Sequence, residues 1–178
     1  MIIIYYDVGG AHSVQVAAGI HLDILPVDRV PSAADLFKMK KFDNTTKDDY
    51  GRILFAGTDN YGNPVYTLSC QYASPIVVPS LRDMHRIQGG NPRQLLLIST
   101  LGTINLLMKI GGFSSRRLGW VGFGRPIVVK GTLKAYPQIA RLVSEVKDLL
   151  PDLMAGKEPA KISEIDKPEI WWSVESTT

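Results

Sequence analysis

The sequence is poor in cysteine and has no long hydrophobic run. Cys70 is the only cysteine among 178 residues, so the chain can form no internal disulfide and no zinc site built from thiolates. The apolar run Met1 to Tyr6 is far shorter than the roughly 18 residues of a membrane-spanning helix. The N-terminus also lacks a basic segment followed by a cleavage site. These absences predict a cytoplasmic protein that neither crosses nor binds a membrane.

Acidic residues are missing from the middle third of the chain. Residues 1–83 carry a net charge of −2 and residues 145–178 a net charge of −4, whereas residues 84–144, here called the cationic block, contain no acid and carry +9. The nine bases are Arg86, Arg93, Lys109, Arg116, Arg117, Arg125, Lys130, Lys134 and Arg141. Such bases either pair with acids elsewhere in the fold and with solvent, or they face an anion.

Strand and helix patterns alternate along most of the chain. Strands are predicted at residues 2–6, 52–56, 65–68, 95–98 and 127–130, and helices at 14–25, 80–88, 103–110 and 133–150. The turn-rich segment between 52–56 and 65–68 indicates a β-hairpin. This order predicts a three-layer α/β/α sandwich with a mainly parallel sheet and an edge β-hairpin. The domain is expected to span residues 1–150, followed by a polar tail at 151–178.

The glycine turn after the first strand is the most informative local pattern. Asp7 ends the strand, Gly9 and Gly10 follow, and Ser13 opens the helix, where it could serve as the N-cap. Backbone N–H groups at the start of a helix bind anions, and ligands of parallel sheets lie beyond the carboxyl ends of the strands. The segment matches the phosphate-binding loop of nucleotide hydrolases only in part, because it has no lysine. A plain structural turn is the alternative.

Three side chains are candidates for catalysis, with the strand-end segments assumed to gather at one rim of the sheet. His12, beside the glycines, could act as general acid, general base or phosphoryl acceptor. Asp7 and Asp59 would hold magnesium or orient water. No metal site built from histidine is expected, because His12, His21 and His85 are too widely spaced.

The cationic block contains the candidate phosphate ligands. Arg116 and Arg117 follow a glycine pair and two serines, and Arg125 lies nearby; guanidinium groups bind phosphate oxygens in pairs. Lys130 closes the strand predicted at 127–130. Exposure to solvent is the alternative for all four.

Four segments together resemble a known family. They are residues 2–22 with the core Tyr-Tyr-Asp-Val-Gly-Gly-Ala-His-Ser, residues 57–63, residues 110–119 and the triplet Gly124-Arg125-Pro126. Over residues 1–147 the chain resembles a small domain-of-unknown-function family of spore-forming Firmicutes. The resemblance implies a bacterial cytoplasmic setting and no catalytic residue.

Two functions follow from these patterns. The first is binding of a phosphorylated small molecule or nucleotide at the glycine turn, with phosphoryl transfer or hydrolysis as the reaction class of an enzyme and magnesium as its candidate cofactor. The second is a non-enzymatic regulatory or interaction module whose cationic surface binds an acidic protein or nucleic acid. The net charge of +3 and the lack of a known nucleic-acid-binding module favour the first. A homo-oligomer is compatible with either.

Overall fold

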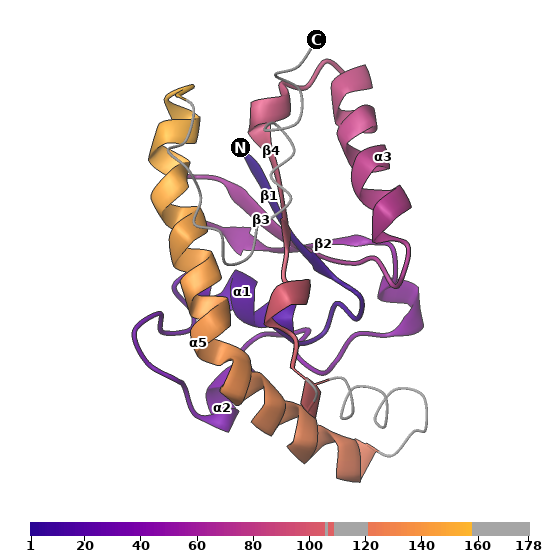
Figure 1. The fold of residues 1–178 in the computed structure, drawn as a ribbon, viewed down its shortest axis with the longest axis vertical. Helices are drawn as coiled ribbons and strands as arrows, with labels where there is room; N and C mark the ends of the chain where they lie inside the picture. Colours follow the sequence, from indigo (N-terminus) through magenta and orange to yellow (C-terminus); the bar gives the residue numbers. More distant parts are fainter. Residues whose placement is uncertain (106, 109–120, 158–178) are drawn as a thin grey trace.

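The computed structural model describes residues 1–105, 107–108 and 121–157 and shows a mixed α/β protein built on a four-stranded sheet (Figure 1). The strands lie in the order β2-β3-β1-β4. Strand β1 is parallel to both of its neighbours, whereas β2 runs antiparallel to β3 at the edge. The strands are β1 (Ile2–Asp7), β2 (Ile53–Thr58), β3 (Pro64–Ser69) and β4 (Leu95–Ser99). The predicted mainly parallel sheet with an edge hairpin is confirmed.

Strand β1 is the centre of the sheet because its residues are apolar on both faces. Ile3 and Tyr5 point into one hydrophobic cluster, and Ile4 and Tyr6 point into another; all four are at most 2% exposed. An unbroken run of β-branched and aromatic residues suits a strand that is covered on both sides.

Helices cover both faces of the sheet. Helices α1 and α5 pack against each other and over the face that Ile3 and Tyr5 line, whereas Val78 of α3 packs on the opposite face (Figure 1). The helices are α1 (Ser13–His21), α2 (Ala33–Leu36), α3 (Ser74–Ile87) and α5 (Val121–Met154), with 3₁₀ turns η1 (Lys47–Asp49), η2 (Pro92–Gln94) and η3 (Leu101–Thr103). Among the described residues, no helix has the length and apolar character needed to cross a membrane.

The strand predicted at residues 127–130 is wrong, because this segment lies inside α5. The Gly131-Thr132 pair does not form a turn. A Cβ on Gly131 would lie 2.8 Å from the backbone nitrogen of Met108, so the glycine permits close packing of the helix on the segment after β4. The Thr132 hydroxyl donates to the carbonyl of Val128 one turn earlier, as threonine does within helices. The β-branched residues therefore face the core from a helix.

The C-terminal helix also extends beyond its predicted end. Pro151 lies within α5, which continues to Met154, and Leu153 is buried in the core. Residues 158–178 of the expected polar tail lie outside the described residues, and so do residues 106, 109 and 110 of the helix expected at 103–110. Of the other residues of that segment, 107–108 are helical, whereas Thr103 ends η3 and 104–105 are not helical.

Candidate functional site

The carboxyl end of β1 lies where the strand order reverses. The chain moves from β1 to β3 on one side of it and later returns to β4 on the other side. In open α/β sheets such a position forms a crevice that binds ligands. The polar residues that end the three parallel strands here are Asp7, Ser69 and the pair Ser99-Thr100.

The Asp7 carboxylate organises the turn that follows β1. One of its oxygens accepts a hydrogen bond from the backbone N–H of Gly10, and the other accepts from the Ser13 hydroxyl, each at 2.5 Å. The Thr100 hydroxyl lies 3.0 Å from the Ser13 oxygen and donates to it. Asp7, Ser13 and Thr100 are all buried. Three predicted site residues, Asp7, Gly10 and Ser13, are thus hydrogen-bonded to one another. The Asp7 carboxylate occupies the position at the helix start that was expected for a bound anion.

Gly10 is required by both the conformation and the packing of this turn. Its φ of +70° lies in the left-handed region, and a Cβ at this position would lie 2.7 Å from the Cβ of Ser69 on the neighbouring strand. Its carbonyl accepts from the Gln15 side chain, which also donates to Thr67 of β3. The neighbouring Gly9 is half-buried in the same turn. The absence of a side chain at Gly10 therefore allows the turn to pack closely against β3.

His12 occupies the N-cap position of α1, which was predicted for Ser13, whereas Ser13 is the first residue of the helix itself. The His12 side chain makes no capping hydrogen bond to the helix. Its Nε2 instead lies 3.3 Å from Oδ1 of Asp43, and its ring meets the ring of Phe42 edge-on. Only 8% of His12 is exposed. The His12 imidazole is therefore positioned by the Phe42 ring and the Asp43 carboxylate, next to the turn between β1 and α1.

Asp43 is a functional candidate that sequence reasoning missed. Its Oδ2 accepts a hydrogen bond from Nε of Arg125 at 2.6 Å, while its Oδ1 faces His12, and its backbone N–H donates to Ala11 in the glycine turn. Burial raises the pKa of Asp43, but hydrogen bonds from His12 and Arg125 outweigh it and lower this pKa below its usual value. The ionised Asp43 carboxylate therefore binds the His12 imidazole with one oxygen and the Arg125 guanidinium with the other.

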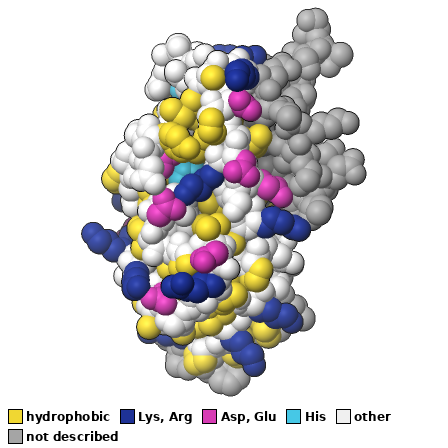
Figure 2. Space-filling view, turned by 90° about the vertical axis from the view of Figure 1, so that its left-hand side faces the viewer, with side chains coloured by type: hydrophobic (Ala, Val, Ile, Leu, Met, Phe, Trp, Pro, Cys, Tyr) yellow, Lys and Arg dark blue, Asp and Glu magenta, His cyan; other side chains and the backbone are white. Residues whose placement is uncertain are grey.

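A hollow of about 500 Å³ opens beside Arg125. The guanidinium carbon lies 5.9 Å from the centre of the Phe37 ring, and Lys130 follows on the same helix. The hollow is lined by Ala33, Phe37, Arg125, Pro126, Val129, Lys130 and Leu133. Figure 2 shows hydrophobic side chains gathered on the lower half of one face, with Lys and Arg among them. Two predicted phosphate ligands, Arg125 and Lys130, thus border one apolar depression.

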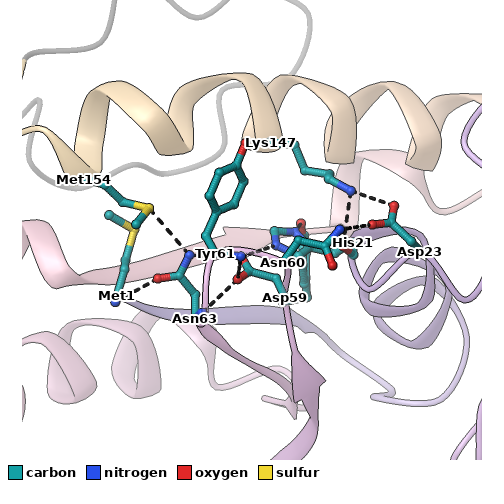
Figure 3. A network of polar contacts seen from close by, with 10 residues as sticks. Met1, His21, Asp23, Asp59, Asn60, Tyr61, Asn63, Lys147 and Met154 are labelled. Carbon is teal, nitrogen blue, oxygen red and sulfur yellow. Dashed lines mark hydrogen bonds and ion pairs between the residues drawn. The ribbon is translucent and has the colours of Figure 1, made fainter.

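Asp59 lies at the opposite end of the sheet from Asp7. Because β2 runs antiparallel to β3, the turn after β2 meets the amino end of β1, and the N-terminal amine of Met1 donates to Asn63 in that turn (Figure 3). The six residues of β1 separate the two ends by about 20 Å. The expectation that Asp7 and Asp59 share one rim is therefore wrong.

Asp59 belongs to a buried polar network. It accepts hydrogen bonds from the backbone N–H groups of Tyr61 and Asn63, and Nε2 of His21 lies 3.3 Å from its Oδ2. The other ring nitrogen of His21 lies 2.8 Å from the hydroxyl of Tyr5 in β1. Burial raises the pKa of Asp59, and hydrogen bonds led by those from Asn63 outweigh it, so the net pKa is lowered. Asp59 fixes the hairpin turn against α1.

Two candidate phosphate ligands, Arg116 and Arg117, lie outside the described residues. Within the described ranges, no group of three or more His, Cys, Asp and Glu side chains is placed to hold a metal ion.

The fold and the residues above define a protein with a mostly parallel α/β sheet and a basic, partly apolar surface near the carboxyl end of its central strand. The chain belongs to the family described as "Protein of unknown function (DUF3189)", which matches residues 2–148. No curated protein and no solved structure matches the chain.

Proposed function

We propose that the protein binds a phosphate-bearing small molecule at the entrance to the β1–α1 turn, with Arg125 and Lys130 as the cations that bind the phosphate and His12 beside them. The observation that supports this proposal is the shared carboxylate of Asp43, which holds His12 and Arg125 on either side although 113 positions of chain separate residue 12 from residue 125. Such convergence of an imidazole and a guanidinium suits a phosphate monoester or a nucleotide.

The hydrogen bonds of the site assign different tasks to its residues. Nε of Arg125 is used by Asp43, and the two Nη groups carry the remaining N–H donors of the guanidinium. Asp43 orients the imidazole of His12 through Nε2, which directs Nδ1 to another partner. His12 would then act as general acid, general base or phosphoryl acceptor in a phosphoryl transfer or hydrolysis. In this proposal magnesium would be bound through the phosphate of the ligand.

In this proposal the β1–α1 turn has a structural role and does not contact the ligand. Its predicted site residues are Asp7, Gly9, Gly10 and Ser13. The bonds of the Asp7 carboxylate to Gly10 and Ser13 use the donors that a bound phosphate would otherwise take. Their task is to fix the start of α1 and with it the position of His12. Asp59, at the far end of the sheet, has no contact with the ligand.

Thermal unfolding with a panel of phosphorylated metabolites and nucleotides tests the proposal. A ligand at 100 times its Kd stabilises a protein by about 2.7 kcal/mol, which corresponds to a rise in Tm of roughly 5 °C or more for a chain of this size. Arg125→Gln and Lys130→Gln should each reduce that rise. Arg141→Gln and Lys134→Gln, exposed bases on the same helix, are the matched controls and should leave it unchanged.

Two results would contradict this function. One is that no phosphorylated compound raises the Tm. The other is that the control substitutions on α5 reduce the rise as much as Arg125→Gln and Lys130→Gln do. If the first result came with salt-sensitive binding of RNA or of an acidic protein, the interaction module would replace the small-molecule site.

We further propose the finer features that the sequence predicts. The helices on the two faces of the sheet support a three-layer α/β/α architecture. The buried, unpaired thiol of Cys70 suits a reducing cytoplasm, in keeping with a spore-forming Firmicute as the source.

A further inference from the structure

We propose that the ligand is a nucleotide whose base lies in the hollow between α2 and α5 while its phosphate binds Arg125 and Lys130. This inference rests on the proposed function and specifies the ligand class. It depends on three properties of the hollow, namely its apolar floor, its two cations and its open shape.

The apolar floor comes from one face of α5 and from α2. Val129 and Leu133 lie on the same helical face as Arg125, at spacings of four and eight residues, and Pro126 also lines the hollow. Opposite them, Phe37 ends α2 and is 46% exposed although its ring contacts Phe42. A large aromatic side chain left open beside aliphatic side chains gains stability when a flat apolar group covers it.

The charge at the rim is complementary to an anion. Arg125 and Lys130 lie five residues apart on α5, which places them about 7.5 Å apart along the helix axis. No acidic side chain is among the residues that line the hollow. The nearby carboxylate of Asp43 is 4% exposed and already bound by Arg125 and His12. A ligand with an apolar ring and an adjacent phosphate therefore satisfies both the floor and the rim.

The open shape favours a ring over an acyl chain. A volume of about 500 Å³ falls within the range of small-molecule sites. The hollow is broad and exposed to solvent, so it would leave much of a flexible acyl chain in water, whereas a planar base can stack on Phe37 or on the guanidinium plane of Arg125. The guanidinium can serve both parts of a nucleotide, since its plane meets the base and its N–H edge meets the phosphate.

Calorimetric titration of the full chain can separate the contributions of base and phosphate. The probes are the four ribonucleoside monophosphates, ribose 5-phosphate, inorganic phosphate and dodecanoate. At least one nucleotide should bind roughly 10-fold more tightly than ribose 5-phosphate, because stacking adds to the phosphate contacts. Phe37→Ala should remove that advantage and leave the affinity for ribose 5-phosphate unchanged. Phe55→Ala is the control, because Phe55 is an exposed aromatic residue on β2 at the sheet edge.

Each other outcome has a defined meaning. If ribose 5-phosphate binds as tightly as every nucleotide, the base site is overturned and the phosphate site stands. If dodecanoate binds and the nucleotides do not, the hollow takes acyl chains and the inference fails. If no phosphorylated probe binds, the proposed function fails and the inference fails with it. An equal loss of affinity in Phe37→Ala and Phe55→Ala would also overturn the inference.

Discussion

Nε of Arg125 lies 2.6 Å from Oδ2 of Asp43, and 82 positions of chain separate the two residues. This bond attaches the first half of α5 to the loop after α2, and the same carboxylate faces His12. The Asp43 side chain is 4% exposed and that of Arg125 is 49% exposed. The pair thus combines a buried acid with a base that solvent still reaches.

Arg125→Gln should lower the free energy of unfolding by about 1 kcal/mol, because it leaves a buried carboxylate with His12 as its remaining side-chain partner while solvent already screens the lost cation. Urea unfolding at neutral pH measures this change. Arg141→Gln should change the free energy by less than about 0.5 kcal/mol, as exposed surface substitutions do. Equal values for the two variants would show that the bond to Asp43 contributes nothing.

Gly10→Ala should destabilise the protein by about 3 kcal/mol, since it combines a left-handed backbone with a Cβ placed 2.7 Å from that of Ser69. Gly62→Ala is the matched control. Gly62 also has a positive φ, but no atom lies within 4 Å of the added carbon, so it should cost about 1 kcal/mol. Thermal or urea unfolding of both variants measures the difference. If they proved equally stable, the contact with β3 would not be tight.

Tyr5→Phe should cost about 1–2 kcal/mol, because it removes the hydroxyl partner of Nδ1 of His21 inside the core. The ring itself stays, so no cavity opens. Equilibrium unfolding of Tyr5→Phe, His21→Gln and the double variant gives the coupling between the two residues. Strictly additive effects would mean that the hydrogen bond does not contribute to stability.

Stability should fall between about pH 7 and pH 5 because of His21. Burial lowers the pKa of His21, and the neighbouring Asp59 offsets this only in part. An unfolded histidine binds a proton near pH 6.5. Below that pH the unfolded chain therefore binds more protons than the folded one, and stability is lost as the pH falls towards the lowered pKa.

Urea unfolding of His21→Gln between pH 5 and pH 8 isolates this contribution. The variant should show a flatter dependence on pH than the unsubstituted chain, whereas His85→Gln, at a half-buried position on α3 remote from Asp59, should retain it. The pKa values of Asp43 and Asp59 are lowered, so their contributions are present above about pH 4 and are lost at lower pH, outside this window. An unchanged slope in His21→Gln would contradict the role of His21.

Local patterns were sufficient to predict the parts of the fold that depend on near neighbours. Ile2 to Tyr6 forms a central strand because both of its faces are apolar, and the turn-rich segment between β2 and β3 forms a hairpin. The pattern Ser32-x-x-Asp35 likewise forms a local capping box, which begins the short helix α2. The strand expected at 127–130 failed because a β-branched run is compatible with a strand or with a buried helix, and packing on α1 decides between them.

The candidate site was harder to predict because its contacts join distant segments. Asp43 lies in a polar loop, and nothing in its local sequence distinguishes it from other loop acids; its role depends on partners 31 and 82 positions away. Asp59 was placed at the wrong end because the shared rim was assumed for all strand ends, whereas the turn of a hairpin lies at the amino end of its second strand, and β3 is parallel to β1. Arg125 was predicted from charge alone, since the cationic block contains no acid that could pair with it locally.

The close backbone packing that Gly131 permits affects how firmly α5 is attached near the site. The backbone of α5 approaches residues 107–108 so closely there that one added carbon would collide, and the Asn105 amide donates to the Gly131 carbonyl. That segment leads back through η3 to Thr100, which holds Ser13. These contacts connect α5 to the β1–α1 turn independently of Asp43. A substitution at Arg125 therefore removes the positive charge and leaves the packing of α5 on this segment in place.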